Sequence, residues 1–350
     1  MSDSIGDDPT WQIDELDPIS LNVVRSSSWP RAAPSVAGAL AVHVTGDVIV
    51  LAHGWLRRLS PDLEERAATQ VPEGTNGLTI MSDGMLIVQH PDGTGGRLMV
   101  VEPEELSEVS GTALPEQPSG KITRDVDGSV DLVYVPGSGR WFRYAYRRGA
   151  LSRDKNWNHR YRRPIEVTTS PGAACVAHGG LWFFGNAAND EFDDDLVRVS
   201  PDEVGTERLQ RVDVRDAKER WLLEAIGFSG GFAAAAPTVV AHPAIAIGFD
   251  SANGGITAWT VVPGDPTEIL WQVGLRNVIQ PLVLLDTREL VVVDVVPLVE
   301  SAVVVLDLMT GLEYGRVGLH AGEQVSGVIP GRNRDIYVLG EPSLIRISAS

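Results

Sequence analysis

The sequence contains a single cysteine, Cys175, which excludes an intramolecular disulfide and a metal site built from several thiolates of one chain. Its longest apolar stretches, such as 233–237 and 291–296, fall far short of the roughly 20 residues that a membrane-spanning helix needs. The first 18 residues are acidic, whereas a secretory signal needs a basic start followed by an apolar run. We therefore expect a cytoplasmic protein that does not span a membrane.

Positive charge is also scarce. The chain has 29 basic and 47 acidic residues, which gives a formal net charge of -18 at pH 7. A charge of this sign opposes attraction to the phosphates of nucleic acids and to anionic lipid surfaces. We therefore expect neither nucleic acid nor a membrane surface as a partner.

What the sequence does contain is a succession of short apolar or alternating runs, interrupted by Gly, Asp, Asn or Pro about every ten residues. A sustained 3.6-residue period is almost absent, and only segments such as Asp213–Leu223 could form short helices. The composition, with 43% hydrophobic and 22% charged residues, is that of a globular protein. These patterns predict an all-β fold.

One unit recurs along the chain: an apolar strand, a turn with Gly and Asp or Asn, a strand rich in Val, Ile and Leu, and a further strand. Its copies lie at 38–61, 76–103, 121–146, 174–201, 244–259, 281–308 and 325–348. Intervals of roughly 40 to 65 residues are typical of propeller blades. A four-stranded sheet cannot bury two apolar faces alone, so such sheets stack around an axis. The repeats predict a β-propeller of seven four-stranded blades.

The last copy has only three strands, and a strand-like segment at 19–27 precedes the first copy. We expect this N-terminal strand to complete the last blade, because pairing it there would close the ring and remove an open sheet edge. The sequence thus predicts an acidic N-terminal extension over 1–18 and a single propeller domain over 19–350.

Three segments carry a resemblance to known propellers. The segments 250–274 (DSANGGITAWTVVPGDPTEILWQVG) and 306–318 (LDLMTGLEYGRVG) resemble PQQ-enzyme-type repeats, with Asp, Gly and an aromatic ending. Segment 179–201 (GGLWFFGNAANDEFDDDLVRVSP) is similar to a blade of the streptogramin B lyase and gluconolactonase-like propellers. The resemblance implies the propeller fold and, for an enzyme, acid–base or metal-assisted chemistry on a small molecule.

The acidic segment 186–195 offers many oxygen ligands of the kind that Ca²⁺ or Mg²⁺ prefers. Its spacing is not that of a self-contained calcium loop, so a metal would need oxygens from other blades. No histidine pair has zinc-binding spacing either. The sequence therefore predicts no metal and no cofactor, with Ca²⁺ or Mg²⁺ as the alternative, and a solvated acidic hairpin at 186–195.

Two histidines, His53 and His178, precede Gly at the ends of predicted inner strands, where a side chain can face a propeller channel. In a mechanism like that of streptogramin lyase, such a histidine would act as general acid or base beside a bound Mg²⁺. They are the candidate catalytic residues. Polar residues beside turns commonly bond only to local backbone, which is the structural alternative.

Segment 140–164 concentrates nine cations and six aromatic residues against one acid in an otherwise acidic chain. Interleaved guanidinium groups and rings can bind carboxylates or phosphates and stack on an aromatic ligand. The candidate recognition residues are Arg140, Trp141, Arg143, Tyr144, Arg147, Arg148, Trp157 and Arg160. The alternatives are a face for an acidic protein and a hairpin whose arginines pair with the acids at 190–195.

Two functions follow from these features. The first is a binding propeller that recognises a small molecule or an acidic protein at its mouth or at the basic and aromatic hairpin. The alternative is an enzyme with an axial site, a lyase, cyclase or lactone hydrolase, because a propeller fold serves both kinds of function.

Overall fold

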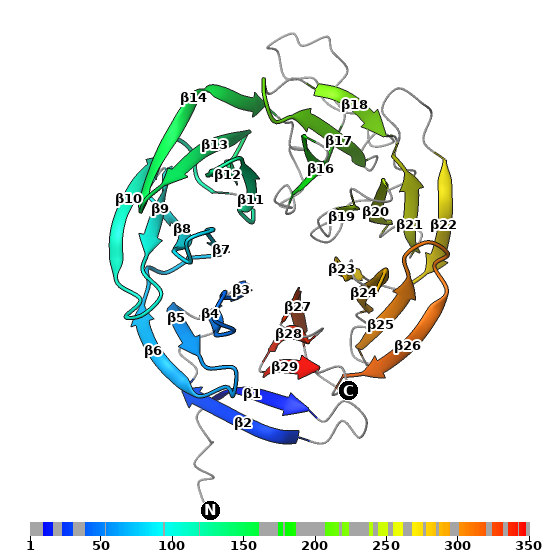
Figure 1. Ribbon diagram of the computed structural model, residues 1–350, viewed down its shortest axis with the longest axis horizontal. Coiled ribbons are helices and arrows are strands. Elements are labelled where there is room, and N and C mark those ends of the chain that lie inside the picture. The colour runs from blue at the N-terminus through cyan, green and yellow to red at the C-terminus, as the bar shows by residue number, and fades with distance from the viewer. Residues whose placement is uncertain are drawn as a thin grey trace, which may run out of the picture.

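The computed structural model describes 20 segments of the chain. They are residues 10–16, 23–30, 39–52, 54–93, 95–118, 120–160, 174–177, 179–186, 207–216, 219–223, 238–240, 244–250, 255–261, 268–275, 278–284, 287–294, 301–319, 324–331, 335–341 and 343–347. Within them the chain forms 29 strands and no helix. The strands build seven sheets arranged as a ring around a central axis, a β-propeller (Figure 1). The predicted all-β propeller is confirmed, and the seven sheets equal the predicted number of repeats.

Six of the blades are antiparallel sheets whose strands follow one another in chain order from the axis outward, and the seventh also contains one parallel pair. The first blade contains β3 (Ala39–Val42), β4 (Val48–Ala52), β5 (Trp55–Leu59) and β6 (Glu65–Gln70). The second contains β7 (Gly77–Ile80), β8 (Leu86–Asp92), β9 (Gly95–Val101) and β10 (Glu108–Leu114). The third contains β11 (Thr123–Asp127), β12 (Val130–Pro136), β13 (Arg140–Arg147) and β14 (Ala150–Arg160).

The remaining blades continue the same order. The fourth contains β15 (Cys175–Ala177), β16 (Gly180–Asn186), β17 (Glu207–Asp213) and β18 (Glu219–Leu223). The fifth contains β19 (Thr238–Val240), β20 (Ile245–Asp250), β21 (Gly255–Thr260) and β22 (Ile269–Gly274). The sixth contains β23 (Val278–Leu284), β24 (Glu289–Asp294), β25 (Ala302–Asp307) and β26 (Glu313–Gly318). The seventh contains β27 (Gln324–Pro330), β28 (Ile336–Glu341) and β29 (Ser343–Ile347), extended by β1 (Thr10–Leu16) and β2 (Val23–Pro30).

Burial depends on the place of a strand within its blade. All five residues of β4 are buried, because both faces of its sheet are covered by neighbouring blades. In the outermost strands β6 and β10, by contrast, most residues are exposed or half-buried. Adjacent residues of β8 serve different interfaces: Leu86 packs with the first blade, and Ile87 packs with the third. This explains why a second strand such as β4 is continuously apolar rather than alternating.

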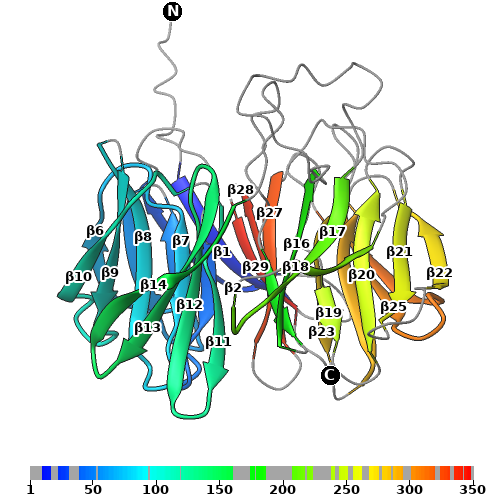
Figure 2. The same cartoon turned by 90° about the horizontal axis from the view of Figure 1, so that it is seen from above.

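The ring has two ends, which Figure 2 shows from the side. At one end, the linker end, the chain passes from one blade to the next, as residues 71–76 do between β6 and β7. At the other, the turn end, lie the turns that join the first and second strands of a blade, such as 43–47 and 81–85. Functional residues on linkers and on turns therefore lie at opposite ends.

The N-terminal segment does extend the last blade, but the predicted closing strand is wrong. β1 pairs in parallel with β29, from Gln12 beside Ser343 to Leu16 beside Ile347. β2, which overlaps the predicted segment 19–27, pairs antiparallel with β1 and is the outermost strand. Residues 10–16, assigned by sequence to an acidic extension, are thus part of the sheet.

The segment Asp213–Leu223, a predicted short helix, is also corrected. Asp213 ends β17, a turn follows at 214–216, and Glu219–Leu223 is β18, which pairs with β17. Pairing with a neighbouring strand outweighs the weak helical preference of the local sequence.

Candidate functional site

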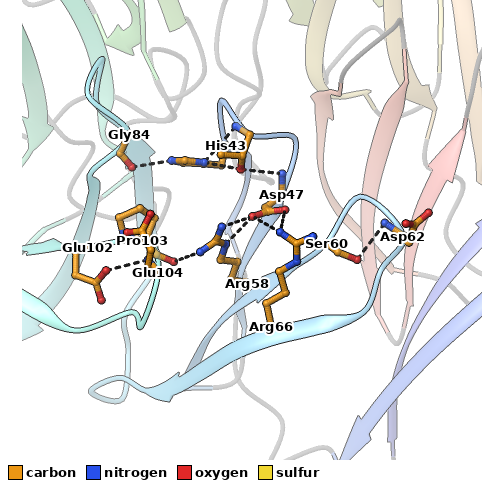
Figure 3. A network of polar contacts seen from close by, with 11 residues as sticks. His43, Asp47, Arg58, Ser60, Asp62, Arg66, Gly84, Glu102, Pro103 and Glu104 are labelled. Carbon is orange, nitrogen blue, oxygen red and sulfur yellow. Dashed lines mark hydrogen bonds and ion pairs between the residues drawn. The ribbon is translucent and has the colours of Figure 1, made fainter.

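The inner turns of the first three blades are joined by polar contacts. His43 Nε2 lies 3.1 Å from the carbonyl oxygen of Gly84, and His43 Nδ1 lies 2.8 Å from Thr45 Oγ1, so both ring nitrogens have partners (Figure 3). In the next pair of blades, the backbone N–H and the hydroxyl of Ser82 each donate to Asp131, at 2.7 Å. These contacts hold the turn end together and account for buried polar residues without a ligand.

A second contact joins the outer parts of the first two blades. Arg58 donates from Nε to Asp47 at 2.6 Å and from Nη1 to the carbonyl oxygen of Pro103 at 3.1 Å (Figure 3). Arg66 also pairs with Asp47, at 3.0 Å. The Asp47 side chain is 1% exposed, so its charge is compensated by these two arginines. We read this network as structural.

The aromatic residues of the predicted recognition hairpin lie in the core. Trp141 and Tyr144 are fully buried, and Trp157 is 1% exposed. Burial raises the pKa of the Tyr144 hydroxyl to about 12. Rings placed in this way cannot stack on a ligand at the surface, so the face of exposed rings that the sequence suggested is not formed by these three residues. The reason is that both faces of the third blade are packed against neighbouring blades.

Two arginines of the same hairpin pair with acidic side chains, and two others are exposed. Arg143 pairs with Asp154 within the hairpin, and this hydrogen bond holds the pKa of Asp154 below its usual value. Arg140 Nε lies 3.7 Å from Glu116 Oε1. Arg147 and Arg148 lie exposed at the β13–β14 turn, and Arg160 forms a strand pair with Arg140. Recognition by the exposed arginines remains a prediction.

The two histidines predicted to be catalytic, His53 and His178, lie outside the described residues. So does the acidic segment from residue 187 to 195, together with its predicted pairing to the hairpin. Among the residues that the structure does describe, no three His, Cys, Asp or Glu side chains are grouped closely enough to hold a metal ion. No helix of this described part could span a membrane.

A cleft of about 480 Å³ lies between the first and second blades. β5, β6 and the linker after β6 form one wall, and β8, β9 and β10 form the other. Apolar side chains line much of it: Leu56, Val71, Pro72, Pro91, Met99, Val101 and Leu106. The polar lining residues are Thr69, Gln70, His90, Asp92, Arg97 and Glu108. This volume is within the range of small-molecule sites, which combine apolar walls with a few polar groups.

His90 differs from His43, the other histidine that is buried among the described residues. Its side chain is 6% exposed, and Nδ1 lies 2.8 Å from the carbonyl oxygen of Pro91. Nε2 is buried and has no hydrogen-bond partner, whereas both nitrogens of His43 are bonded. A buried polar atom without a partner costs free energy, about 1–3 kcal/mol by mutational data. Among the residues that line the cleft, His90 is therefore the one with a buried polar atom that a ligand could satisfy.

The strand alternation of β8 places His90 in the cleft. Leu86 and Val88 pack with the first blade, and His90, two residues further on, lines the cleft on that same side. Gln89 faces away from the cleft: its Nε2 donates to Asn76 Oδ1, in the linker before β7, at 3.2 Å and to the carbonyl oxygen of Gly120, in the linker before β11 of the third blade, at 2.9 Å. The period of two in a strand thus directs two successive polar residues into different interfaces.

Charged residues lie at the edge of the cleft. Arg97 pairs with Glu108, and the two side chains are 42% and 35% exposed. Asp92 is exposed at the end of β8. The apolar walls can exclude water from the body of a ligand, while His90 and the edge residues can orient its polar groups.

Comparisons with known proteins identify the class of fold. No family model matches the chain, and no curated protein matches it. Among solved structures, BamB from Moraxella catarrhalis aligns with a TM-score of 0.56 and 14% identity, over 93% of this chain and 88% of its own. NirN, a dihydro-heme d1 dehydrogenase in complex with DHE, aligns with a TM-score of 0.58 and 11% identity, over 95% of this chain and 68% of its own. The Dos1 propeller aligns with a TM-score of 0.51 and 10% identity, over 83% of this chain and 72% of its own.

Because the identities are this low, these structural alignments establish the β-propeller fold alone. In total, 813 solved chains match, so the likeness cannot select one function among those that propellers serve.

Proposed function

We propose that this chain is a binding propeller that recognises a small molecule in the cleft between its first and second blades. The observation that carries the proposal is His90, a buried side chain that lines the cleft and has an unpartnered Nε2. Buried polar groups in proteins are nearly always hydrogen-bonded, and exceptions often mark functional positions. The likeness to BamB and to NirN with its bound DHE is compatible with binding but does not specify a ligand.

The walls of the cleft support the same function. Val71 and Pro72 come from the linker after the first blade, and Pro91 and Met99 come from the second blade, so a ligand would contact both sides of the cleft. Apolar contact area contributes roughly 25 cal/mol per Å² removed from water. A compact apolar ligand can therefore gain affinity from the walls, and a polar group can gain specificity from His90.

The enzyme alternative, with His53 or His178 as general acid or base, remains a prediction because both residues lie outside the described part of the chain. The contacts of the described residues favour the cleft.

Methyl NMR tests the proposal directly. The chain has five methionines, of which Met99 lines the cleft and Met309 lies in the sixth blade. In a screen of chemically diverse fragments, we expect some compounds to shift the Met99 methyl signal and leave Met309 unchanged. Absence of any Met99 response across the library at millimolar concentration would contradict the proposed function.

A pair of variants localises the binding. Thr69→Trp places a bulky ring in the cleft, because Thr69 is one of its lining residues. Ala68→Trp adds the same ring at the exposed neighbouring position of β6, outside the cleft lining. Fragment binding should be lost in Thr69→Trp and kept in Ala68→Trp. Binding that persists in Thr69→Trp would place the ligand elsewhere.

A further inference from the structure

The hydrogen bonding of His90 specifies which kind of ligand the cleft takes, an inference that rests on the proposed function. Nδ1 lies 2.8 Å from the carbonyl oxygen of Pro91, and a carbonyl oxygen only accepts hydrogen bonds. Nδ1 must therefore carry the proton that it donates. In the neutral imidazole the other nitrogen, Nε2, is then unprotonated and can only accept.

We propose that the cleft binds compact apolar molecules that carry a hydrogen-bond donor, either a hydroxyl or an N–H group, and that this group donates to His90 Nε2. The apolar body of the ligand packs between the two blades, against the accessible parts of Val71, Pro72 and Pro91. Nε2 has almost no accessible surface, so the donor can reach it only when lining side chains move aside. Only a group that enters the cleft can form this bond.

The same geometry selects against carboxylates. A carboxylate would bring its lone pairs toward the lone pair of Nε2, and no hydrogen bond could form between two acceptors. At the edge, Glu108 is paired with Arg97, and Asp92 adds a further negative charge. The cleft therefore differs in specificity from the exposed arginines Arg147 and Arg148, which suit an anion.

Matched probe pairs that differ only by methylation of the donor test this selectivity. The pairs are phenol and anisole, indole and 1-methylindole, and 2-naphthol and 2-methoxynaphthalene, each titrated while the Met99 methyl signal is followed. One hydrogen bond contributes about 0.5–1.5 kcal/mol, so the donor member should bind about two- to twelvefold more tightly.

Variants assign the preference to one atom. His90→Phe keeps the bulk of the ring and removes Nε2, so the two members of each pair should then bind with about equal affinity. His90→Gln offers an amide oxygen as acceptor and should restore part of the preference. His43→Phe is the matched control: its side chain is also buried, but its two nitrogens already have partners, so the preference should not change.

The outcomes separate this inference from the proposed function. If both members of a pair shift Met99 with equal affinity, or the methylated member binds more tightly, the donor requirement is overturned while the cleft remains a binding site. If no probe shifts Met99, molecules of the proposed class do not enter, which also overturns the inference. The fragment screen then decides separately whether the cleft binds anything. A preference that survives His90→Phe would assign the acceptor to another residue.

Discussion

Arg58 donates a hydrogen bond from Nη1 to the carbonyl oxygen of Pro103 at 3.1 Å and thereby fastens the first blade to the outer turn of the second. The same arrangement recurs one blade earlier, where Arg346 donates to the carbonyl oxygen of Pro61 at 3.1 Å. Each arginine is held by a buried aspartate of its own blade, Asp47 or Asp335. The repeat thus encodes a contact between blades as well as the strands within each blade.

Replacement of Arg58 by methionine should lower the free energy of unfolding by about 2–4 kcal/mol, because it removes one of the two cations that compensate buried Asp47. Arg97→Met is the matched control, since Arg97 and its partner Glu108 are both substantially exposed, and it should cost less than about 1 kcal/mol. Urea denaturation of both variants measures the difference. Equal losses would show that the contact between blades is no stronger than a surface ion pair.

Gly84→Ala should destabilise the protein more than Gly128→Ala. Both glycines have positive φ values, 90° and 62°, at which a side chain is strained, at a cost of about 1–3 kcal/mol. At Gly84 a Cβ would also lie 2.7 Å from His43 Nε2, whereas at Gly128 it would meet no atom within 4 Å. Thermal melts of the two variants isolate the contribution of the His43 contact. A larger loss for Gly128→Ala would contradict the account of this turn.

Asp131 should make part of the stability depend on pH. Burial raises its pKa, but hydrogen bonds from the N–H and hydroxyl of Ser82 and from Arg124 outweigh burial and hold the pKa below the usual 3.8. A carboxylate with a lowered folded-state pKa stabilises the fold fully above pH 3.8, and this contribution is lost as the pH falls through the lower folded-state value.

The difference in unfolding free energy between the wild type and Asp131→Asn should therefore be constant at neutral pH and shrink below about pH 4. Asp127→Asn, at the exposed end of β11, is the control and should show little difference at any pH. Denaturant titrations at several pH values measure this. A difference that grows on acidification would have the wrong sign for the hydrogen bonds of Asp131.

The sequence predicted the architecture because that architecture is repeated. The central residues of buried second strands such as β4 and β24 are apolar, and Gly occupies the turns at 46, 84 and 128, where φ is positive. The order of strands at the ring closure was less accessible. Acidic residues surround Trp11 and Ile13, which made β1 resemble a solvated tail although it pairs with β29.

A deletion tests this corrected closure. Removal of residues 1–31 takes away β1 and β2 and leaves the edge of β29 unpaired, so the melting temperature should fall sharply. Removal of residues 1–8, which precede β1, should leave the melting temperature nearly unchanged. If both truncated proteins melt like the full chain, β1 contributes nothing to closure.

The candidate site could not be predicted from the sequence, for two physical reasons. In the basic and aromatic hairpin, the interleaving of Arg143 with Trp141 and Tyr144 reflects a strand whose two faces are both covered, which no local pattern reveals. In the sequence, nothing beside His90 except Pro91 indicates a site. The opposite wall of its cleft comes from β5 and β6 of the preceding blade. Clefts between repeats depend on how the repeats pack.

The most direct test of the central claim is the ¹⁵N NMR spectrum of the His90 side chain, recorded with and without 2-naphthol. Our account requires that Nδ1 carries the proton, that Nε2 is an unprotonated acceptor, and that the Nε2 resonance moves on addition of 2-naphthol in the wild type but not in Thr69→Trp. A proton on Nε2 of the neutral ring, or an Nε2 resonance that 2-naphthol leaves unchanged while Met99 shifts, would contradict it.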